Sequence, residues 1–205
     1  MRRIHKGKEP KALEEYRAQL PVPPPKAAWD EFTQKDGAMH SVTQEQRELC
    51  AFCQGRMACK RTGMKLAHVI PQNGTSEGEL LRLTWSNIVG ACRGGDTDPR
   101  PRLLHCDSLQ GNTPLLPQLD PVQFVNGSLH YNLDGEIHSP DRDVEAQIEN
   151  VLGLNRKPVL RKRLEALDGV DGIKSLLKSS PEPERQREEL IDLLDPDHPS
   201  DQPLP

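Results

Sequence analysis

The feature that most constrains this chain is a set of four cysteines within one region. Cys50 and Cys53 are separated by two residues, and Cys92 and Cys106 follow further along. Two thiolates at the first spacing can reach one ion at about 2.3 Å, and the two later cysteines can complete a tetrahedral set. The sequence therefore predicts a structural Zn²⁺ site that ties several segments of the chain together.

A redox pair is the alternative for Cys50 and Cys53, but the thioredoxin-like βαβ pattern that accompanies such pairs is not recognisable around them. The chain holds five cysteines, an odd number, and lacks a recognisable secretion signal. Both features favour thiolate metal ligation over disulfides. Cys59 is then left over, as a free thiol or as a replacement for one of the four ligands.

Three polar residues with catalytic potential lie among these cysteines. His68 belongs to a short apolar run at 66–70, which Pro71 closes as at a strand end. The second apolar run, at 88–91, follows Asn87 and predicts a partner strand. Residues 103–109 predict a helix that carries Asp107. A lone histidine in an apolar strand is more often a structural residue than a catalyst.

The order of these elements changes that reading of His68. A strand with a histidine, a nearby asparagine and a helix with an aspartate follow the order of a ββα-metal nuclease centre. Phosphodiester hydrolysis there needs an imidazole to take a proton from water and a cation to hold the developing charge. His68 and Asp107 fit these two roles.

The rest of the chain predicts an α+β protein. Helices are expected at 11–20 and 27–32, and a third, capped by Ser41 or Thr43, runs toward Cys50. Turns at 126–127 and 134–135 predict a three-strand meander with strands at 122–125, 129–133 and 136–138. Two further helices are expected, one starting at Ser139-Pro140 and one after Asn155.

Composition suggests three regions. A proline-rich helical arm is expected at 1–40, the nuclease domain with its helical end at 41–178, and an acidic proline-rich tail at 179–205. The tail contains a short apolar patch at 190–194, either a docking peptide or a frayed solvated helix.

Charge and hydropathy restrict the partners. The net charge is −4, and the tail from Ser179 holds eight acidic and two basic residues, so the remainder is close to neutral. Nucleic-acid affinity must then come from a local cluster, a metal or a partner subunit. A cluster of basic residues before His68 is either a phosphate contact or a solvated face; its members are Arg56, Lys60, Arg61 and Lys65.

Aromatic residues make up only 3% of the chain, which argues against base stacking on single strands. Apolar runs also stay well short of the roughly 20 residues that a membrane span needs. We therefore expect a soluble, cytoplasmic protein with no membrane partner.

Taken together, the motifs resemble the HNH endonuclease family. They are Cys50-x2-Cys53, the run Ala67-His68-Val69-Ile70-Pro71, the run from Trp85 through Asn87 to Cys92, and His105-Cys106-Asp107-x3-Gly111. More narrowly, the chain is similar to the HNH subunit of Septu and retron-associated anti-phage systems. The opening residues 1–13 and the region 126–154 share in that likeness, which covers most of residues 1 to 170.

The resemblance implies a metal-dependent endonuclease acting on DNA or tRNA, with an ABC-type ATPase as partner. His68 becomes the general base, Asn87 orients the histidine-bearing loop, and Asp107 is a ligand of a catalytic Mg²⁺ or Mn²⁺. His105 is a further candidate ligand for that cation. The alternative is a zinc-stabilised adaptor whose nuclease site has decayed.

Three positions depart from the family pattern. Ala67 stands where an acidic metal ligand is common, so the cation is bound weakly, is completed by His105 or Glu77, or is absent. Such an alanine is also what a deliberate inactivating substitution would leave. Gln110 stands where a lysine is common. Cys92 and Cys106 have 13 residues between them, so the intervening segment must bulge outward for both to ligate zinc.

Overall fold

A computed structural model describes residues 1–96, 100, 103–124, 127, 129–132 and 134–168. Residues Met1–Lys162 form one compact unit, and a second unit begins at Arg163. The expected tail at 179–205 and its apolar patch lie outside the described residues. No helix in the described part is both long and apolar enough to cross a membrane.

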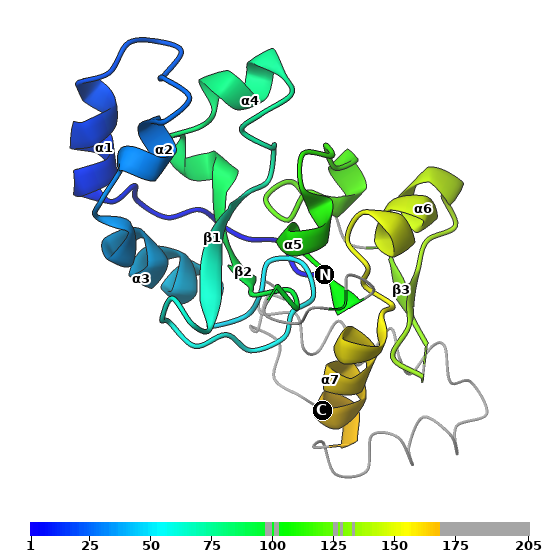
Figure 1. The fold of residues 1–205 in the computed structure, drawn as a ribbon. Coiled ribbons are helices and arrows are strands. Elements are labelled where there is room, and N and C mark those ends of the chain that lie inside the picture. Colours follow the sequence, from blue (N-terminus) through cyan, green and yellow to red (C-terminus); the bar gives the residue numbers. More distant parts are fainter. Residues whose placement is uncertain (97–99, 101–102, 125–126, 128, 133, 169–205) are drawn as a thin grey trace, which may run out of the picture. The chain divides into compact units, whose positions relative to one another are not determined.

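The described elements confirm the α+β class (Figure 1). The helices are α1 Lys11–Ala18, α2 Ala28–Glu31, α3 Lys35–Glu45, α4 Ser76–Leu80, α5 Asp107–Gln110, α6 Arg142–Asn150 and α7 Lys157–Asp168. The strands are β1 Met64–His68, β2 Ile88–Cys92, β3 His130–Tyr131 and β4 Ile137–His138. Short 3-10 turns occupy η1 Trp85–Asn87 and η3 Pro117–Leu119.

The centre of the unit is the antiparallel hairpin of β1 and β2. Met64 pairs with Cys92 at one end, and His68 pairs with Ile88 at the other. The hairpin was predicted, but β1 begins two residues earlier than the apolar run suggests and ends at His68. Every residue of β2 is buried, because α3 packs against this hairpin.

Gln46, which follows α3, fastens that helix to β2. Its side-chain amide donates to the Gly90 carbonyl at 2.8 Å and accepts from the Gly90 amide at 2.6 Å. A Cβ on Gly90 would lie 3.0 Å from the Met64 methyl and 3.2 Å from a methyl of Val42. Glycine therefore permits the close approach of α3 to the strand.

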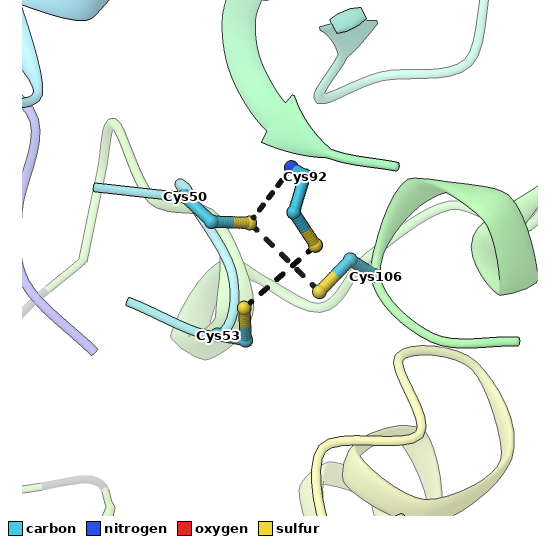
Figure 2. A group of neighbouring side chains, drawn as sticks. All are labelled: Cys50, Cys53, Cys92 and Cys106. Atoms are coloured by element: carbon cyan, nitrogen blue, oxygen red, sulfur yellow. Dashed lines mark hydrogen bonds between the residues drawn. The ribbon is translucent and has the colours of Figure 1, made fainter. Parts of the chain in front are cut away.

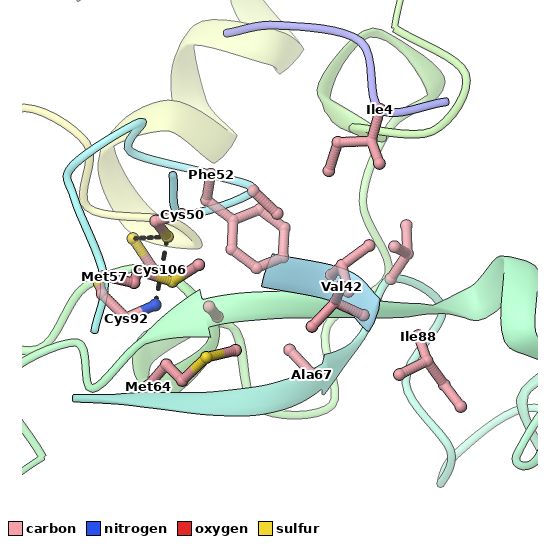
Figure 3. Close-up of a cluster of buried hydrophobic side chains, with 14 of the residues drawn as sticks. Ile4, Val42, Cys50, Phe52, Met57, Met64, Ala67, Ile88, Cys92 and Cys106 are labelled. Carbon is pink, nitrogen blue, oxygen red and sulfur yellow. Dashed lines mark hydrogen bonds between the residues drawn. The ribbon is translucent and has the colours of Figure 1, made fainter. Parts of the chain in front are cut away.

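The hydrophobic core gathers side chains from the hairpin, from α3 and from the cysteine turn, including Val42, Phe52 and Ile88 (Figure 3). The N-terminal segment contributes to the same core, with Leu13 fully buried and Phe32 2% exposed. Each such side chain stabilises the fold by about 1.5–3 kcal/mol. Helix α3 also continues across residue 40, where an arm was expected to end.

The third helix was predicted too late in the chain. Helix α3 begins at Lys35, and Ser41 and Thr43 lie inside it, where their hydroxyls donate to the Gly37 and Met39 carbonyls. It stops at Glu45 because the following residues turn, with positive φ at 47 and 48. Serine and threonine favour N-cap positions, but inside a helix their hydroxyls can also donate to the carbonyl four residues earlier. The sequence alone does not distinguish between these two positions.

The predicted meander is also partly wrong. In the described part of this region the structure has two strands, β3 and β4, and residues 121–123 form a turn; Val125 lies outside the described residues. Asp120 holds that turn, because its Oδ1 accepts from the amides of Val122 and Gln123 at 2.8 and 3.2 Å. An aspartate bonded to its own downstream amides competes with strand pairing.

The helix expected at 103–109 is shorter than predicted. Helix α5 begins at Asp107, because Cys106 has a φ of 54° and its amide donates to the Leu152 carbonyl at 2.8 Å. The helix predicted from Ser139 is confirmed as α6, with Asp141 as its N-cap. The helix predicted after Asn155 is confirmed as α7.

Candidate metal centre and histidine site

The four predicted cysteine ligands meet in one place. Cys50 and Cys53 lie on the turn after α3, Cys92 ends β2 and Cys106 precedes α5, and Figure 2 shows their sulfurs pointing toward one another. All four side chains are buried, and their sulfur atoms lie within 4.8 Å of one another. This is the only group of three or more His, Cys, Asp or Glu side chains suited to a metal among the described residues.

The spacing of the sulfurs matches a tetrahedral zinc site. Sγ of Cys50 lies 3.8 Å from Sγ of Cys106, and Sγ of Cys53 lies 3.9 Å from Sγ of Cys92. Sulfurs at about 2.3 Å from a tetrahedral Zn²⁺ are about 3.8 Å apart. The residues therefore fit a structural metal such as zinc, and Cys92 and Cys106 reach the same cluster although 13 residues separate them in the sequence.

Polar groups around the cluster favour thiolate. The Cys92 amide donates to Sγ of Cys50 at 3.3 Å. Hydrogen bonding with Cys106 lowers the pKa of Cys92 to about 6. Burial raises the pKa of Cys106 well above its usual value. The cluster thus holds some thiolate even without a cation, and an ion would be needed to deprotonate the rest.

His105 belongs with this cluster in the structure. Its Nδ1 donates to the Leu103 carbonyl at 2.8 Å, and the side chain interacts with Cys92. Burial lowers the pKa of His105, but these two interactions outweigh burial and raise it overall. The position suits a residue that supports the thiolates, whereas the sequence suggested a ligand for the second cation.

Cys59 stands outside the cluster. Its Sγ lies 3.5 Å from Nδ1 of His40, near the surface. The choice of Cys50, Cys53, Cys92 and Cys106 as the ligand set therefore fits the geometry, and Cys59 is a free thiol.

His68 lies at the end of β1, 8% exposed. Its Nε2 is 2.9 Å from the Arg82 carbonyl. Because a carbonyl only accepts, Nε2 must carry the proton, and in the neutral ring Nδ1 has the free lone pair. Among the described residues nothing hydrogen-bonds to Nδ1, and this atom is not sealed from solvent.

Two residues that the sequence did not single out hold His68 in place. Trp29 of α2 packs edge-on against the imidazole with ring centroids 4.8 Å apart. Arg82, 3% exposed, extends its guanidinium to the Pro24 carbonyl at 2.6 Å and to the Gln72 carbonyl at 3.0 Å. These bonds fix the backbone whose carbonyl receives the His68 proton, and the isolated sequence carries no spacing signal for them.

The charge state of His68 follows from burial. Desolvation lowers its pKa, outweighing the opposing effects of the Arg82 carbonyl and the Asp107 charge. The imidazole is therefore neutral at neutral pH, as a proton acceptor must be.

Asn87 holds the backbone of the segment that follows His68. Its side chain brackets one peptide unit, accepting from the Ile70 amide at 2.8 Å and donating to the Ile70 carbonyl at 3.0 Å. The Asn87 carbonyl also accepts from the Val69 amide at 3.0 Å. The two residues after His68 are thus fixed by Asn87, which is 4% exposed and does not itself bond to the imidazole.

Asp107 is the first residue of α5 and forms an ion pair with Lys65 of β1, at 2.6 Å between Oδ2 and Nζ. Lys65 also donates to Oγ of Ser108 at 2.7 Å. Both charged side chains remain 24% exposed. Asp107 is close enough to His68 for its charge to act on the imidazole.

Within the described residues, a full ligand set for a catalytic Mg²⁺ or Mn²⁺ does not assemble. Ala67 is 2% exposed and belongs to the core, so the position before His68 offers no metal ligand. Gln110 is buried and donates to the Val69 carbonyl at 3.1 Å, which is support for the histidine loop in place of a phosphate contact. Asp107 is the predicted carboxylate whose charge acts on His68.

The basic cluster before His68 is largely engaged in ion pairs. Arg56 pairs with Glu48 at 3.9 Å, and Arg61 pairs with Asp36 at 3.0 Å, both at the surface. With Lys65 bound to Asp107, the solvated-face reading fits these side chains better than a preformed phosphate grip.

In comparisons with known proteins, no protein-family model and no curated protein matches the sequence.

Proposed function

We propose that this protein is a phosphodiester hydrolase of the HNH type that uses His68 as its general base. The supporting observation is the orientation of the imidazole. Nε2 is committed to the Arg82 carbonyl, and Nδ1 is left as a neutral acceptor at the end of a hairpin that also carries a zinc-type cysteine cluster.

The chain's own residues supply the following chemistry. Nδ1 of His68 accepts a proton from water as the water oxygen attacks phosphorus, and the leaving oxygen departs with the electrons of its P–O bond. Asn87 and Gln110 hold the backbone after His68, so the base does not need to be reoriented at each turnover.

A catalytic Mg²⁺ or Mn²⁺ would be held by Asp107 together with oxygens of the substrate phosphate, as is usual for Mg²⁺. When bound, such a cation neutralises the charge that develops on the phosphorane. Lys65 must then release Asp107, and its ammonium group is free to face the phosphate.

The second candidate is an adaptor with a decayed nuclease site. It is favoured by one observation, that Asp107 is already neutralised by Lys65 while Ala67 offers no ligand. In both cases the resemblance to anti-phage subunits is the basis for the proposed ABC-type ATPase partner and for DNA or tRNA as substrate.

Cleavage of DNA and tRNA by the full-length protein, alone and with a copurifying ATPase, separates the two candidates. The reactions contain Mg²⁺ or Mn²⁺, and the variants are His68→Ala and the matched control His130→Ala, whose side chain is exposed. We expect cleavage that is lost in the His68 variant and kept in the control. Circular dichroism and zinc content verify that both variants fold.

Cleavage that survives His68→Ala would refute the nuclease proposal. A wild-type complex that binds its ATPase and nucleic acid without cleaving would support the adaptor.

A further inference from the structure

A cavity of about 200 Å³ opens beside the segment that follows His68. Val69 and Ile70 form one wall, and Leu115 and Pro117 contribute further apolar surface. Four polar side chains also line the cavity: Thr75, Glu77, Asp120 and Gln123. The volume is below the roughly 300 Å³ at which drug-sized ligand pockets begin, which suits one small ring system.

The two main walls are fixed by buried or half-buried side chains. Asn87 holds both polar atoms of the Ile70 backbone. On the other side, Gln147 of α6 accepts from the Leu116 amide at 2.9 Å and donates to the Pro114 carbonyl at 3.1 Å. The cavity is therefore preformed and does not depend on a mobile loop.

Three of the four polar side chains, those of Thr75, Asp120 and Gln123, make hydrogen bonds within the protein. Oγ1 of Thr75 caps α4 by accepting from the Gly78 amide at 3.0 Å, which leaves its hydroxyl proton available. Asp120 is 8% exposed, and its Oδ2 accepts from the Gln123 side-chain amide at 2.9 Å. One of the two N–H groups of Gln123 is engaged in this bond, and the Gln123 side-chain oxygen can accept a hydrogen bond from a ligand.

The chemistry offered to a ligand is mostly that of an acceptor. Glu77, Asp120 and the Gln123 oxygen accept hydrogen bonds, and Thr75 supplies one hydroxyl donor. The residues that line the cavity include two carboxylates and no lysine or arginine. A phosphate is therefore repelled, whereas a flat ring with an amino group finds apolar walls and acceptors for its protons.

We propose that this cavity binds one unstacked nucleobase with an exocyclic amino group, adenine, cytosine or guanine, next to the bond attacked at His68. The proposal rests on the proposed nuclease function and adds a base preference to it. The apolar surfaces of Val69 on one wall and of Leu115 and Pro117 on the other favour a ring over the side chain of a partner protein's lysine or arginine.

Binding is measured on the full-length, zinc-loaded protein by amide chemical shifts. Cytidine and thymidine are titrated separately, and lysine amide serves as the cationic alternative. Glu77→Gln removes one carboxylate, and Leu115→Trp fills the cavity. Leu80→Trp is the matched control, because Leu80 is 50% exposed in α4 and does not line the cavity.

We expect cytidine to shift the amides of Ile70, Thr75 and Gln123. Thymidine should bind at least about fivefold more weakly, which is the low end of the discrimination for one lost base contact. Leu115→Trp abolishes these shifts, Glu77→Gln weakens them, and Leu80→Trp leaves them unchanged. Equal binding of both nucleosides, no binding, or shifts caused by lysine amide alone would overturn the proposal.

Two further arms keep this result separate from the nuclease test. If the base is read within a strand, an oligothymidylate with one central cytidine shifts the same amides as free cytidine. If free cytidine shifts them and the oligonucleotide does not, the cavity is a nucleoside site, and the proposed subsite next to the cleaved bond is overturned. Cleavage without any cytidine binding refutes the cavity proposal and leaves the nuclease proposal standing. Binding of the oligonucleotide without cleavage refutes the nuclease proposal and leaves the base site.

Discussion

Removal of the metal from the cysteine cluster tests the central architectural feature. The cluster joins segments far apart in the chain, with 38 residues between Cys53 and Cys92 and 13 between Cys92 and Cys106. If each connection acts as a cross-link, the chain-entropy relation gives about 4 kcal/mol for the longer loop and about 3 kcal/mol for the shorter one. We therefore expect chelation to lower the free energy of unfolding by about 7 kcal/mol, as much as the whole stability of many domains.

The assay is urea unfolding of the reduced protein, followed by tryptophan fluorescence, with and without zinc. Trp85 and Trp29 are both buried, so both report on the core around the hairpin. Elemental analysis should find about one zinc per chain, and Co²⁺ exchanged into the site should show the absorption of a tetrahedral tetrathiolate. Cys106→Ala should lower the free energy of unfolding by at least the share of the shorter loop, about 3 kcal/mol, because the remaining thiolates close neither the tetrahedron nor that loop.

Cys59→Ala is the control, since Cys59 lies outside the cluster. It should keep the zinc and nearly all of the stability. The reasoning is refuted if the native protein contains no zinc after gentle purification. It is equally refuted if chelation changes the unfolding free energy by less than about 1 kcal/mol, because the four sulfurs would then not be holding the fold.

Three further predictions concern single side chains. Asn87→Ala should lower the unfolding free energy by about 2–4 kcal/mol in urea titrations, since two Ile70 backbone groups lose their partners; a loss under about 1 kcal/mol would contradict this. Lys6→Ala should cost about 3 kcal/mol by breaking the buried pair with Glu45, whereas a variant of the exposed Lys11 should cost under about 0.5 kcal/mol. Hydrogen bonding with Glu145 raises the pKa of His138. This half-exposed pair should therefore add at most about 1 kcal/mol to the free energy of unfolding below about pH 6.5, and this contribution should be lost as pH rises through the raised pKa. Unfolding of His138→Ala, measured as a function of pH, should lack that step.

Several elements could be predicted because their signals are local. The spacing of Cys50 and Cys53, the apolar runs on both sides of Asn87, and the turns near residues 127 and 135 depend on neighbouring residues. The hairpin and the cysteine set followed from them, and helices α1, α6 and α7 followed from helix-start residues and helical spacing of apolar side chains. Element boundaries were less accurate, because Thr43 and Asp120 make side-chain bonds that compete with the expected pattern.

The roles of charged and polar residues were harder to predict. The sequence left Lys65 open between a phosphate contact and a solvated face, and the structure pairs it with Asp107. His105 was a candidate ligand of the second cation, and in the structure it interacts with Cys92 of the cysteine cluster. Both outcomes depend on which way a side chain points from its element. A shift of one residue in a strand, or a different first residue of a helix, changes the direction in which a side chain points. Helix α5, for example, starts later than its apolar pattern suggests.

By itself the sequence determined the ligand set and the order of strand, strand and helix, since cysteine spacing and hydrophobic pattern are properties of short stretches. Only the tertiary structure decided how the His68 imidazole is oriented. Nε2 of His68 donates to the carbonyl of Arg82, which lies 14 positions later in the chain. The Arg82 guanidinium in turn donates to the carbonyl of Pro24, 58 positions before Arg82. Contacts at such separations arise from packing of the whole unit, so no local pattern encodes the neutral, oriented imidazole on which the proposed chemistry depends.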